Sequence, residues 1–243
     1  MKHLLISFCC LLGTLAGMAQ EEKNVVYDAN VEVRKVADFK EIEVSGAIDL
    51  FLSQGSEEAV AVSASADEVR DRIRTEVRNG VLYISFDTKG WNWRSWSNSK
   101  MKAYVTFKDL KKVEATGACN VKTTGSIKVA ELRIELSGAS DFSGAVQAEK
   151  LVIDASGASN AKISGTAGKA EIDASGACSI RAFDLKVDYC KVEASGASGI
   201  RIHVNKELNA EASGGSNVYY RGEGMIRDIS TSGAASVKRR NED

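Results

Sequence analysis

Acidic residues recur at a nearly constant interval in the second half of the chain. Each lies three residues before a glycine of a repeated phrase, at Glu114, Glu135, Asp154, Asp173, Glu193 and Glu211. If the repeats stack as strands, neighbouring carboxylates lie ~5 Å apart. Retaining glycosidases use two carboxyl groups at about this separation. The spacing therefore raises the hypothesis of a polysaccharide-active enzyme with carboxylates on one face.

The competing interpretation is that this column of carboxylates is structural. A catalytic pair consists of two singular residues in a cleft, whereas these acids recur in every repeat. Nearby cations such as Lys112, Arg133 and Lys191 offer ion-pair partners. We therefore favour a solvated, ion-paired column with no catalytic residue. The chain has no calcium-loop motif, so we expect no metal site along it.

Three tryptophans lie within six residues, in the segment GWNWRSW: Trp91, Trp93 and Trp96. Tryptophans in a polar loop can stack on sugar rings or insert into a partner. Alternatively, Trp91 and Trp93 share one strand face and cover a local apolar patch. Both interpretations stay open, and the three tryptophans are our candidate contact residues for a ligand or partner.

Other nucleophile and metal chemistry has little support. His203 is the only histidine after residue 3, which excludes the usual Ser-His-Asp and multi-histidine zinc arrangements. It lies between Ile202 and Val204, so we expect it to point outward. The repeated Ser-Gly-Ala-Ser lacks the second glycine of a nucleophile elbow. The sequence predicts no enzyme, no metal and no cofactor.

The repeated phrase, typified by EASGAS at 193–198, determines the expected architecture. Its shared glycines are Gly46, Gly117, Gly138, Gly157, Gly176, Gly196, Gly214 and Gly233. From Gly117 onward the spacings are 21, 19, 19, 20, 18 and 19 residues. A period this short is typical of a solenoid, whose repeats must stack to bury their apolar faces.

Apolar and polar residues alternate on both sides of each glycine, as in Ile153, Asp154 and Ala155 before Gly157. This alternation predicts two short strands per repeat with a glycine corner between them. About 19 residues are too few for a strand and a long helix. The sequence therefore predicts an all-β parallel β-helix with ~19-residue coils, whose handedness it leaves open.

The chain divides into five expected segments. Residues 1–19 form a signal peptide, with a basic start, an apolar run and small residues before Gln20. A polar lead-in at 20–37 precedes an N-terminal β section with an insertion at 38–113. Regular β-helix repeats occupy 114–238, and 239–243 form a charged tail that blunts the last coil. We expect an exported protein, periplasmic or at the cell surface, with no transmembrane segment after the signal.

The insertion, residues 54–107, gives the N-terminal section its irregular outline. Ser65 and Glu68 form a capping box that predicts a short helix over 66–74. Asn79-Gly80 between two β-rich stretches predicts a tight hairpin. We expect this section to carry one short helix and one hairpin.

Cysteine positions and net charge limit the possible partners and bonds. Cys119, Cys178 and Cys190 fall on inward positions, and Cys119 lies three coils from Cys178, too far for a disulfide. We therefore predict three buried free thiols. A net charge of −1 argues against nucleic acid as a partner.

Several stretches together resemble a known family. They are FKEIEVSGAIDLFLSQG, NGVLYISF, KMKAYVTF followed by DLKKVEATGAC, and the serial SGAS repeats. These resemble the GIN-domain family, which carries the description "putative auto-transporter adhesin head" and has no established activity. The resemblance implies a β-helical secreted or envelope protein of Bacteroidetes-type bacteria.

We expect an exported, non-enzymatic β-helical protein of the bacterial cell envelope that contacts protein or glycan. The alternative is the polysaccharide-active enzyme with carboxylates on one face. The sequence leaves self-association into a homo-oligomer open.

Overall fold

The computed structural model describes residues 28, 30–92 and 99–240. The predicted signal peptide, Trp93 and Trp96 lie outside the described residues. The elements are β1 (Glu32–Arg34), β2 (Glu41–Gly46), β3 (Ile48–Gln54), β4 (Ala59–Ala64), α1 (Asp67–Arg70), β5 (Ile73–Arg78), β6 (Val81–Phe86), β7 (Met101–Phe107), β8 (Lys112–Gly117), β9 (Asn120–Leu136), β10 (Asp141–Ala155), β11 (Asn160–Ala174), β12 (Ser179–Ala194), β13 (Gly199–Ala212), β14 (Asn217–Arg221), β15 (Met225–Thr231) and β16 (Ser236–Arg239).

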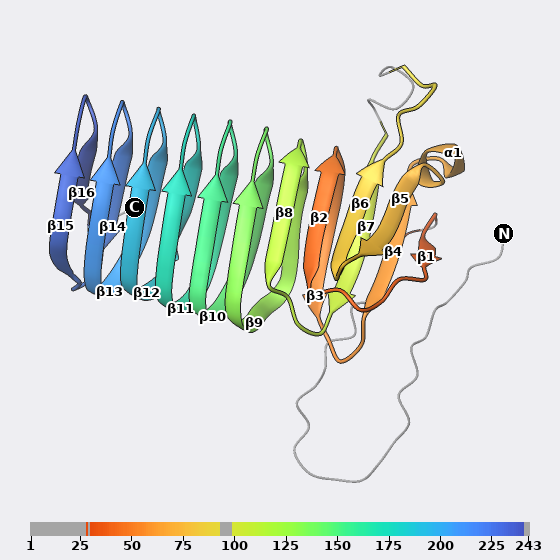
Figure 1. The fold of residues 1–243 in the computed structure, drawn as a ribbon, viewed down its shortest axis with the longest axis horizontal. Coiled ribbons are helices and arrows are strands. Elements are labelled where there is room, and N and C mark those ends of the chain that lie inside the picture. The colour runs from red at the N-terminus through yellow and green to blue at the C-terminus, as the bar shows by residue number, and fades with distance from the viewer. Residues whose placement is uncertain (1–27, 29, 93–98, 241–243) are drawn as a thin grey trace, which may run out of the picture.

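The predicted solenoid is confirmed: β8 to β16 form a stack of parallel coils (Figure 1). Equivalent residues of successive repeats pair in register, so that Ile134, Ile153, Ile172 and Val192 lie one above another. All four are fully buried or nearly so. The inward positions of the alternating pattern therefore merge into one continuous dry core.

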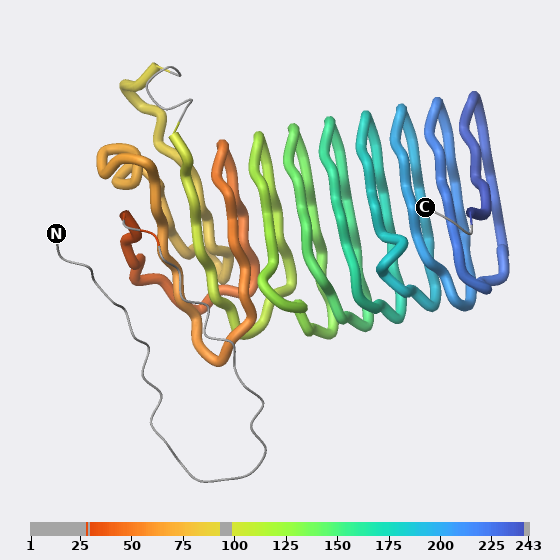
Figure 2. Tube along the Cα trace, turned by 180° about the vertical axis from the view of Figure 1, so that it is seen from behind, coloured from red at the N-terminus to blue at the C-terminus, as the bar shows by residue number. Residues whose placement is uncertain are grey.

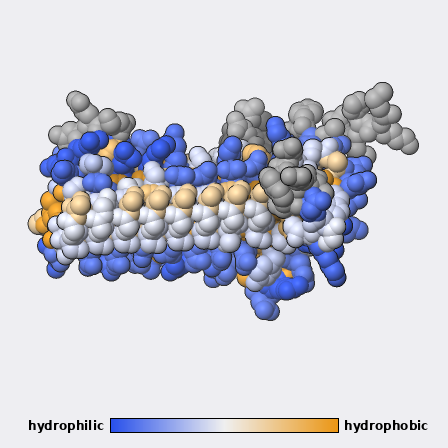
Figure 3. All heavy atoms as spheres, turned by 90° about the horizontal axis from the view of Figure 1, so that it is seen from above, coloured by the Kyte–Doolittle hydropathy of each residue, from blue (hydrophilic) through white to orange (hydrophobic). Residues whose placement is uncertain are grey.

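The glycine corners align along a single edge of the stack (Figure 1). The amide N–H that follows each corner glycine donates to the carbonyl of the corner glycine one coil earlier. Ala158 N–H donates to Gly138 O at 2.8 Å, and Ala177 N–H donates to Gly157 O at 2.8 Å. Every corner glycine has a positive φ, between +69° and +103°. Figure 3 shows this edge as a straight stripe of intermediate hydropathy, white to pale orange.

Each coil differs from the predicted pair of short strands. β9 to β13 are single strands of 14 to 17 residues that run from one corner to the next. They bend at the opposite edge of the stack (Figure 2). Register shifts mark that bend, as between Ser143 and Ala145. The parallel pairing survives the bend, so only the glycine corner interrupts the strands.

The bent strands give the solenoid two outward faces. We call the outward residues that precede each corner glycine the pre-glycine flank, on β2, β8, β15 and the second halves of β9–β13. We call those that follow it the post-glycine flank, on β3, β14, β16 and the first halves of β9–β13.

The N-terminal section extends both flanks with antiparallel strands. β6 pairs in parallel with β2, and β5 pairs antiparallel with β6 through the predicted Asn79-Gly80 turn. On the other side β7 pairs in parallel with β3, and β4 and β1 follow antiparallel. Strand β1 lies within residues 20–37, the segment predicted to be a polar lead-in. These strands continue the stack beyond its first coil by edge-to-edge pairing.

The predicted helix exists but is shorter, and its predicted capping box is wrong. α1 has four residues, Asp67–Arg70, and its N-cap is Ala66, with no side-chain cap hydrogen bond. The helix ends early because Ile73 begins β5, where it pairs with Phe86. Strand pairing therefore outweighs the local helix signal.

The C-terminal end of the solenoid is open. β15 and β16 form the last coil, and Met225 is 69% exposed, Ile226 43% and Ile229 38%. Figure 3 shows this hydrophobic end. Of the charged tail expected at 239–243, Arg239 ends β16 and Arg240 N–H donates to Tyr220 O at 2.8 Å, while 241–243 lie outside the described residues.

Replacing Gly157 with alanine is expected to destabilise the protein strongly. An added Cβ would lie 2.5 Å from the carbonyl oxygen of Gly138, and the φ of +72° is unfavourable for alanine. The φ penalty is about 1–2 kcal/mol, and the steric clash adds roughly 1–3 kcal/mol. Urea unfolding measures the loss.

Gly125→Ala is the matched control for that substitution. Gly125 has a φ of +75°, but an added Cβ would meet nothing within 4 Å. It should therefore cost only the backbone penalty. Equal losses of stability for Gly157→Ala and Gly125→Ala would show that the corners are not closely stacked.

Candidate functional site

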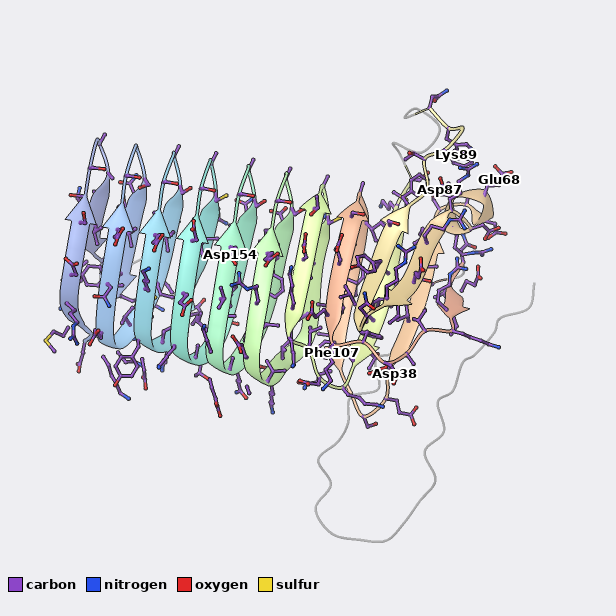
Figure 4. All side chains as sticks on the ribbon, in the orientation of Figure 1. Asp38, Glu68, Asp87, Lys89, Phe107 and Asp154 are labelled. Carbon is purple, nitrogen blue, oxygen red and sulfur yellow. The ribbon has the colours of Figure 1, made fainter. Side chains whose placement is uncertain are left out.

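The register assembles the predicted carboxylates into one column on the pre-glycine flank. Glu114 pairs with Glu135, Glu135 with Asp154, and the column continues through Asp173, Glu193 and Glu211. Asp154 lies on an outward position midway along the solenoid (Figure 4). One member was missed in the sequence: Glu43 pairs with Glu114 and begins the column. The alignment of EVSGAI with EATGAC contains that signal.

Cations are interleaved with these carboxylates, as the structural interpretation expects. The Lys112 ammonium lies 2.8 Å from a Glu114 oxygen and 2.7 Å from a Glu135 oxygen. Arg133 contacts both Glu135, at 3.5 Å, and Asp154. The column is therefore bridged by cations along its first half.

The second half of the column has fewer cations. Lys191 pairs with Glu193 at 2.6 Å. Lys150 lies four residues before Asp154 of the column. It pairs with Glu171 at 3.3 Å and lies 3.9 Å from Glu131. The pre-glycine flank thus combines charges of both signs in close pairs, and these pairs limit its net field.

Burial and like charges perturb two of the carboxyl groups. Burial raises the pKa of Asp154, and neighbouring Glu135 and Asp173 raise it further, while Arg133 acts in the opposite direction. Burial, followed by the charge of Glu114, raises the pKa of Glu43. Carboxylates stacked at strand spacing disfavour simultaneous ionisation, as expected for like charges.

An open hollow of about 280 Å³ lies at the N-terminal end of this column. Glu43, Glu76, Arg78 and Tyr83 line it, together with Arg74 and neighbouring residues of β2 and β6. Arg78 donates two hydrogen bonds to the Glu76 carboxylate, at 2.6 and 2.5 Å, and lowers the pKa of Glu76. The hollow therefore contains one carboxyl group with a raised pKa and one with a lowered pKa.

The described tryptophan serves local packing. Trp91 meets the Phe86 ring edge-on at 6.4 Å, and the Arg72 guanidinium lies 4.4 Å from its ring centre. Arg72 also donates to the carbonyl oxygens of Asp87 and Lys89, at 3.1 and 2.8 Å. Asp87 and Lys89 mark the base of this loop in Figure 4. These contacts fix the loop where it leaves β6.

The corner residues have structural roles. The second serine of the repeated phrase points inward, and Ser140, Ser159, Ser198 and Ser216 are buried. The Ser159 hydroxyl donates to the Ser156 carbonyl at 2.9 Å, which satisfies a corner carbonyl. Cys119 and Cys178 replace this serine at two corners, and the Cys178 thiol donates to Ser175 O at 3.1 Å. The repeated phrase therefore stabilises the corner both by the close approach of its glycines and by hydrogen bonds from its buried serine or cysteine.

The three described cysteines are free and buried, as predicted. Burial raises the pKa of the Cys190 thiol to about 12, and it also raises the pKa values of Cys119 and Cys178. His203 occupies an outward, half-buried position on β13. Burial, then Arg221 and Lys186, lower its pKa.

The described part of the chain comprises residues 28, 30–92 and 99–240. Within these ranges no three His, Cys, Asp or Glu side chains gather closely enough to hold a metal ion. None of the helices in the described part of the chain is long and apolar enough to cross a bilayer.

One sequence family and several solved structures match this chain. The family described as "Putative auto-transporter adhesin, head GIN domain" matches residues 38–224. No curated protein matches the chain.

The solved structures share the fold at low sequence identity. An adhesin, named as putative, from Bacteroides fragilis has a TM-score of 0.78 and 21% identity, and the match covers 86% of this chain and 96% of that one. A "putative lipid binding protein" from Parabacteroides distasonis has a TM-score of 0.64 and 21% identity, covering 88% and 98%. A "putative adhesin" from the same species has a TM-score of 0.68 and 21% identity, covering 87% and 96%.

Lys112→Gln should destabilise the protein by about 1 kcal/mol at pH 7, because two half-buried carboxylates lose their shared cation. Burial alone would lower the pKa of Lys112, but hydrogen bonds to Glu114 and Glu135 raise it above its ordinary range. A raised lysine pKa contributes stability fully below the unfolded value of ~10.4 and loses it at higher pH. Urea unfolding should thus give a constant difference from pH 7 to pH 9 that shrinks above about pH 10.4.

Lys169→Gln is the control for Lys112→Gln. Lys169 lies on the same flank and is exposed, and the described ion pairs do not include it. It should change stability by less than about 0.5 kcal/mol. A similar loss for both variants would contradict the role of the bridging cation.

A thiol reagent should label none of Cys119, Cys178 and Cys190 in the native protein, since all three are at most 3% exposed. A chain with Cys9 and Cys10 replaced by serine isolates these thiols. Absorbance after reagent addition should show no rapid phase without denaturant and three equivalents in denaturant. A rapid native phase would contradict their inward register.

Proposed function

The chain belongs to the GIN-domain family of auto-transporter adhesin heads, and from that premise we propose that it is a non-enzymatic binding protein of the bacterial cell envelope. Its ligand is a glycan or an envelope protein. The adhesin names of the related structures support a binding role. The predicted signal peptide supports export to the periplasm or the cell surface.

The observation that carries this proposal is the repetition of the outward faces. The carboxylates of the pre-glycine flank recur in successive coils, where Lys112 and Arg133 each bridge two of them and Lys191 pairs with Glu193. Such pairs neutralise charge along the column, and carboxylates that repeat in every coil differ from the singular, activated group on which catalysis usually depends. A rigid, repeating surface instead suits an extended ligand that contacts several coils.

The tryptophan segment is the second proposed contact region, with Trp91, Trp93 and Trp96 as its members. The packing of Trp91 against Phe86 and Arg72 supports the segment at its base. We assign contact with a sugar ring or partner to Trp93 and Trp96, because indole rings present large, rigid areas for stacking.

A binding screen with neutral glycans, acidic glycans and envelope-protein extracts tests this function. The double variant Trp93→Ala/Trp96→Ala should weaken binding about tenfold with little change in thermal stability. Loss of aromatic contacts costs roughly 1–3 kcal/mol of binding free energy. Trp91→Ala should instead lower the melting temperature, because it removes the contacts to Phe86 and Arg72. Absence of binding to every member of the screen would contradict the proposal.

A second candidate function, polysaccharide hydrolysis, rests on the hollow beside Glu43. It holds a carboxyl group with a raised pKa and one, Glu76, with a lowered pKa. Paired acid and base roles arise from such differences. The same glycan panel, assayed for new reducing ends, distinguishes the two functions. Turnover that Glu43→Gln abolishes would replace the binding function with the enzymatic one.

A further inference from the structure

The post-glycine flank carries a second column of outward side chains, five residues after each corner glycine. Its members pair in register along the stack: Phe51, Lys122, Ser143, Lys162, Arg181, Arg201, Tyr219 and Lys238. We call the last five of these, from Lys162 to Lys238, the basic column. It contains four cations and one aromatic ring on five consecutive coils.

The cations of the basic column face one another without counter-charges. Lys162 pairs directly with Arg181, and Arg181 pairs directly with Arg201. Among the described ion pairs, none includes Lys162, Arg181, Arg201 or Lys238. Like charges directly opposite on a sheet destabilise it. The fold therefore tolerates a repulsion that a bound anion would relieve.

The positions two residues before and two residues after the basic column carry no carboxylate in these five coils, although the exposed Asp184 follows Arg181 by three residues and pairs with Arg221 at 3.4 Å. Two residues before the basic column they are Asn160, Ser179, Gly199, Asn217 and Ser236, and two residues after it they are Ser164, Phe183, His203, Arg221 and Arg240. The lowered pKa of His203, due to burial and then to Arg221 and Lys186, agrees with a positive field here. The pre-glycine flank differs, because its like-charged pair Lys150 and Lys169 has Glu131 and Glu171 beside it.

Tyr219 divides the basic column with an aromatic ring held between cations. The Arg201 guanidinium lies 5.9 Å from the ring centre and that of Arg240 lies 4.3 Å from it. Tyr219 is half-buried, and Arg240, the nearer cation, is exposed, so a stacked ligand would displace that guanidinium from the ring. An aromatic ring flanked by cations combines a stacking platform with anion-binding groups.

We propose that the basic column binds a linear anionic polysaccharide. The carboxylate, sulfate or phosphate groups of the glycan face Lys162, Arg181, Arg201 and Lys238, and one sugar ring stacks on Tyr219. Four strand intervals of ~4.8 Å make a line of about 19 Å, so the site fits several residues of an extended chain rather than a single small anion. This inference rests on the proposed binding function and names its ligand class.

Other polyanions fit the same charges less well. A membrane surface calls for apolar side chains that enter the lipid beside the cations, and the exposed large hydrophobic residues, Val33, Tyr189, Met225, Ile226 and Ile229, are not members of this flank. A nucleic-acid partner calls for an overall basic domain, whereas this chain has a net charge of −1. A flat line of cations with one stacking ring favours an acidic glycan.

Isothermal titration of the full chain tests the proposal with five probes: polygalacturonate, heparin, neutral dextran, single-stranded DNA and anionic phosphatidylglycerol vesicles. Polygalacturonate or heparin should bind, dextran should not, and added salt should weaken binding, because screening acts on exposed charges. The double variant Arg181→Gln/Arg201→Gln should reduce the affinity about tenfold or more, since it removes two charge-assisted contacts.

The matched control is Lys150→Gln/Lys169→Gln, which removes the same charge from a directly paired position on the pre-glycine flank. It should leave the affinity within about twofold, as expected when the lost charges do not contact the ligand. Melting curves confirm that both double variants fold. Tyr219→Ala should weaken glycan binding without changing its salt dependence.

The outcomes separate this inference from the proposed function. Equal losses for the two double variants, or preference for DNA or vesicles over both acidic glycans, would overturn the basic column as a glycan site. Binding of a neutral glycan or an envelope protein that Arg181→Gln/Arg201→Gln leaves unchanged would also overturn it, while the proposed function would stand. No binding to any probe or to the wider screen would remove both.

Discussion

The hydrogen bonds between successive glycine corners hold the rest of the structure in register. The N–H after each corner glycine donates to the preceding corner at 2.7–2.8 Å. At that spacing the backbones leave no room for a Cβ, as Gly157 and Gly176 both illustrate. Once the corners are fixed, the period-2 pattern sends Ile153 inward and Asp154 outward in the same coil. Core and surface columns both follow from this one contact.

The solenoid was predictable because its signals are local and repeated. Glycine spacing and alternation in the SGAS repeats specify the coil length, the corner and the inward positions, including those of Cys119, Cys178 and Cys190. The hairpin at Asn79-Gly80 was predictable for the same reason, since a two-residue turn depends on its own backbone.

Features that depend on distant partners were not predictable. The bend in β9 to β13 keeps its pairing because the next coil follows it, and glycines such as Gly165 mark it in some coils but not in β12, so no shared local residue predicts it. α1 ends where Ile73 pairs with Phe86 in β6. The hollow beside Glu43 forms because the insertion pairs β6 with β2 and places Glu76 and Arg78 on β5, the next strand beyond β6. In each case the decisive contact joins segments whose pairing the pattern does not encode.

Variation among the internal repeats separates structural positions from functional ones. Corner positions hardly vary, because glycine and small residues are the only ones the stacked backbones accept. Outward positions have no such constraint. The post-glycine flank carries Ser143 in one coil and Lys162, Arg181 and Arg201 in the next three. Stability does not require cations at those places, and their mutual repulsion opposes folding slightly. The fold neither needs nor neutralises this line of cations, so we infer that a ligand outside the chain neutralises it. The solenoid holds the cations in a straight line at even spacing, which suits an extended ligand.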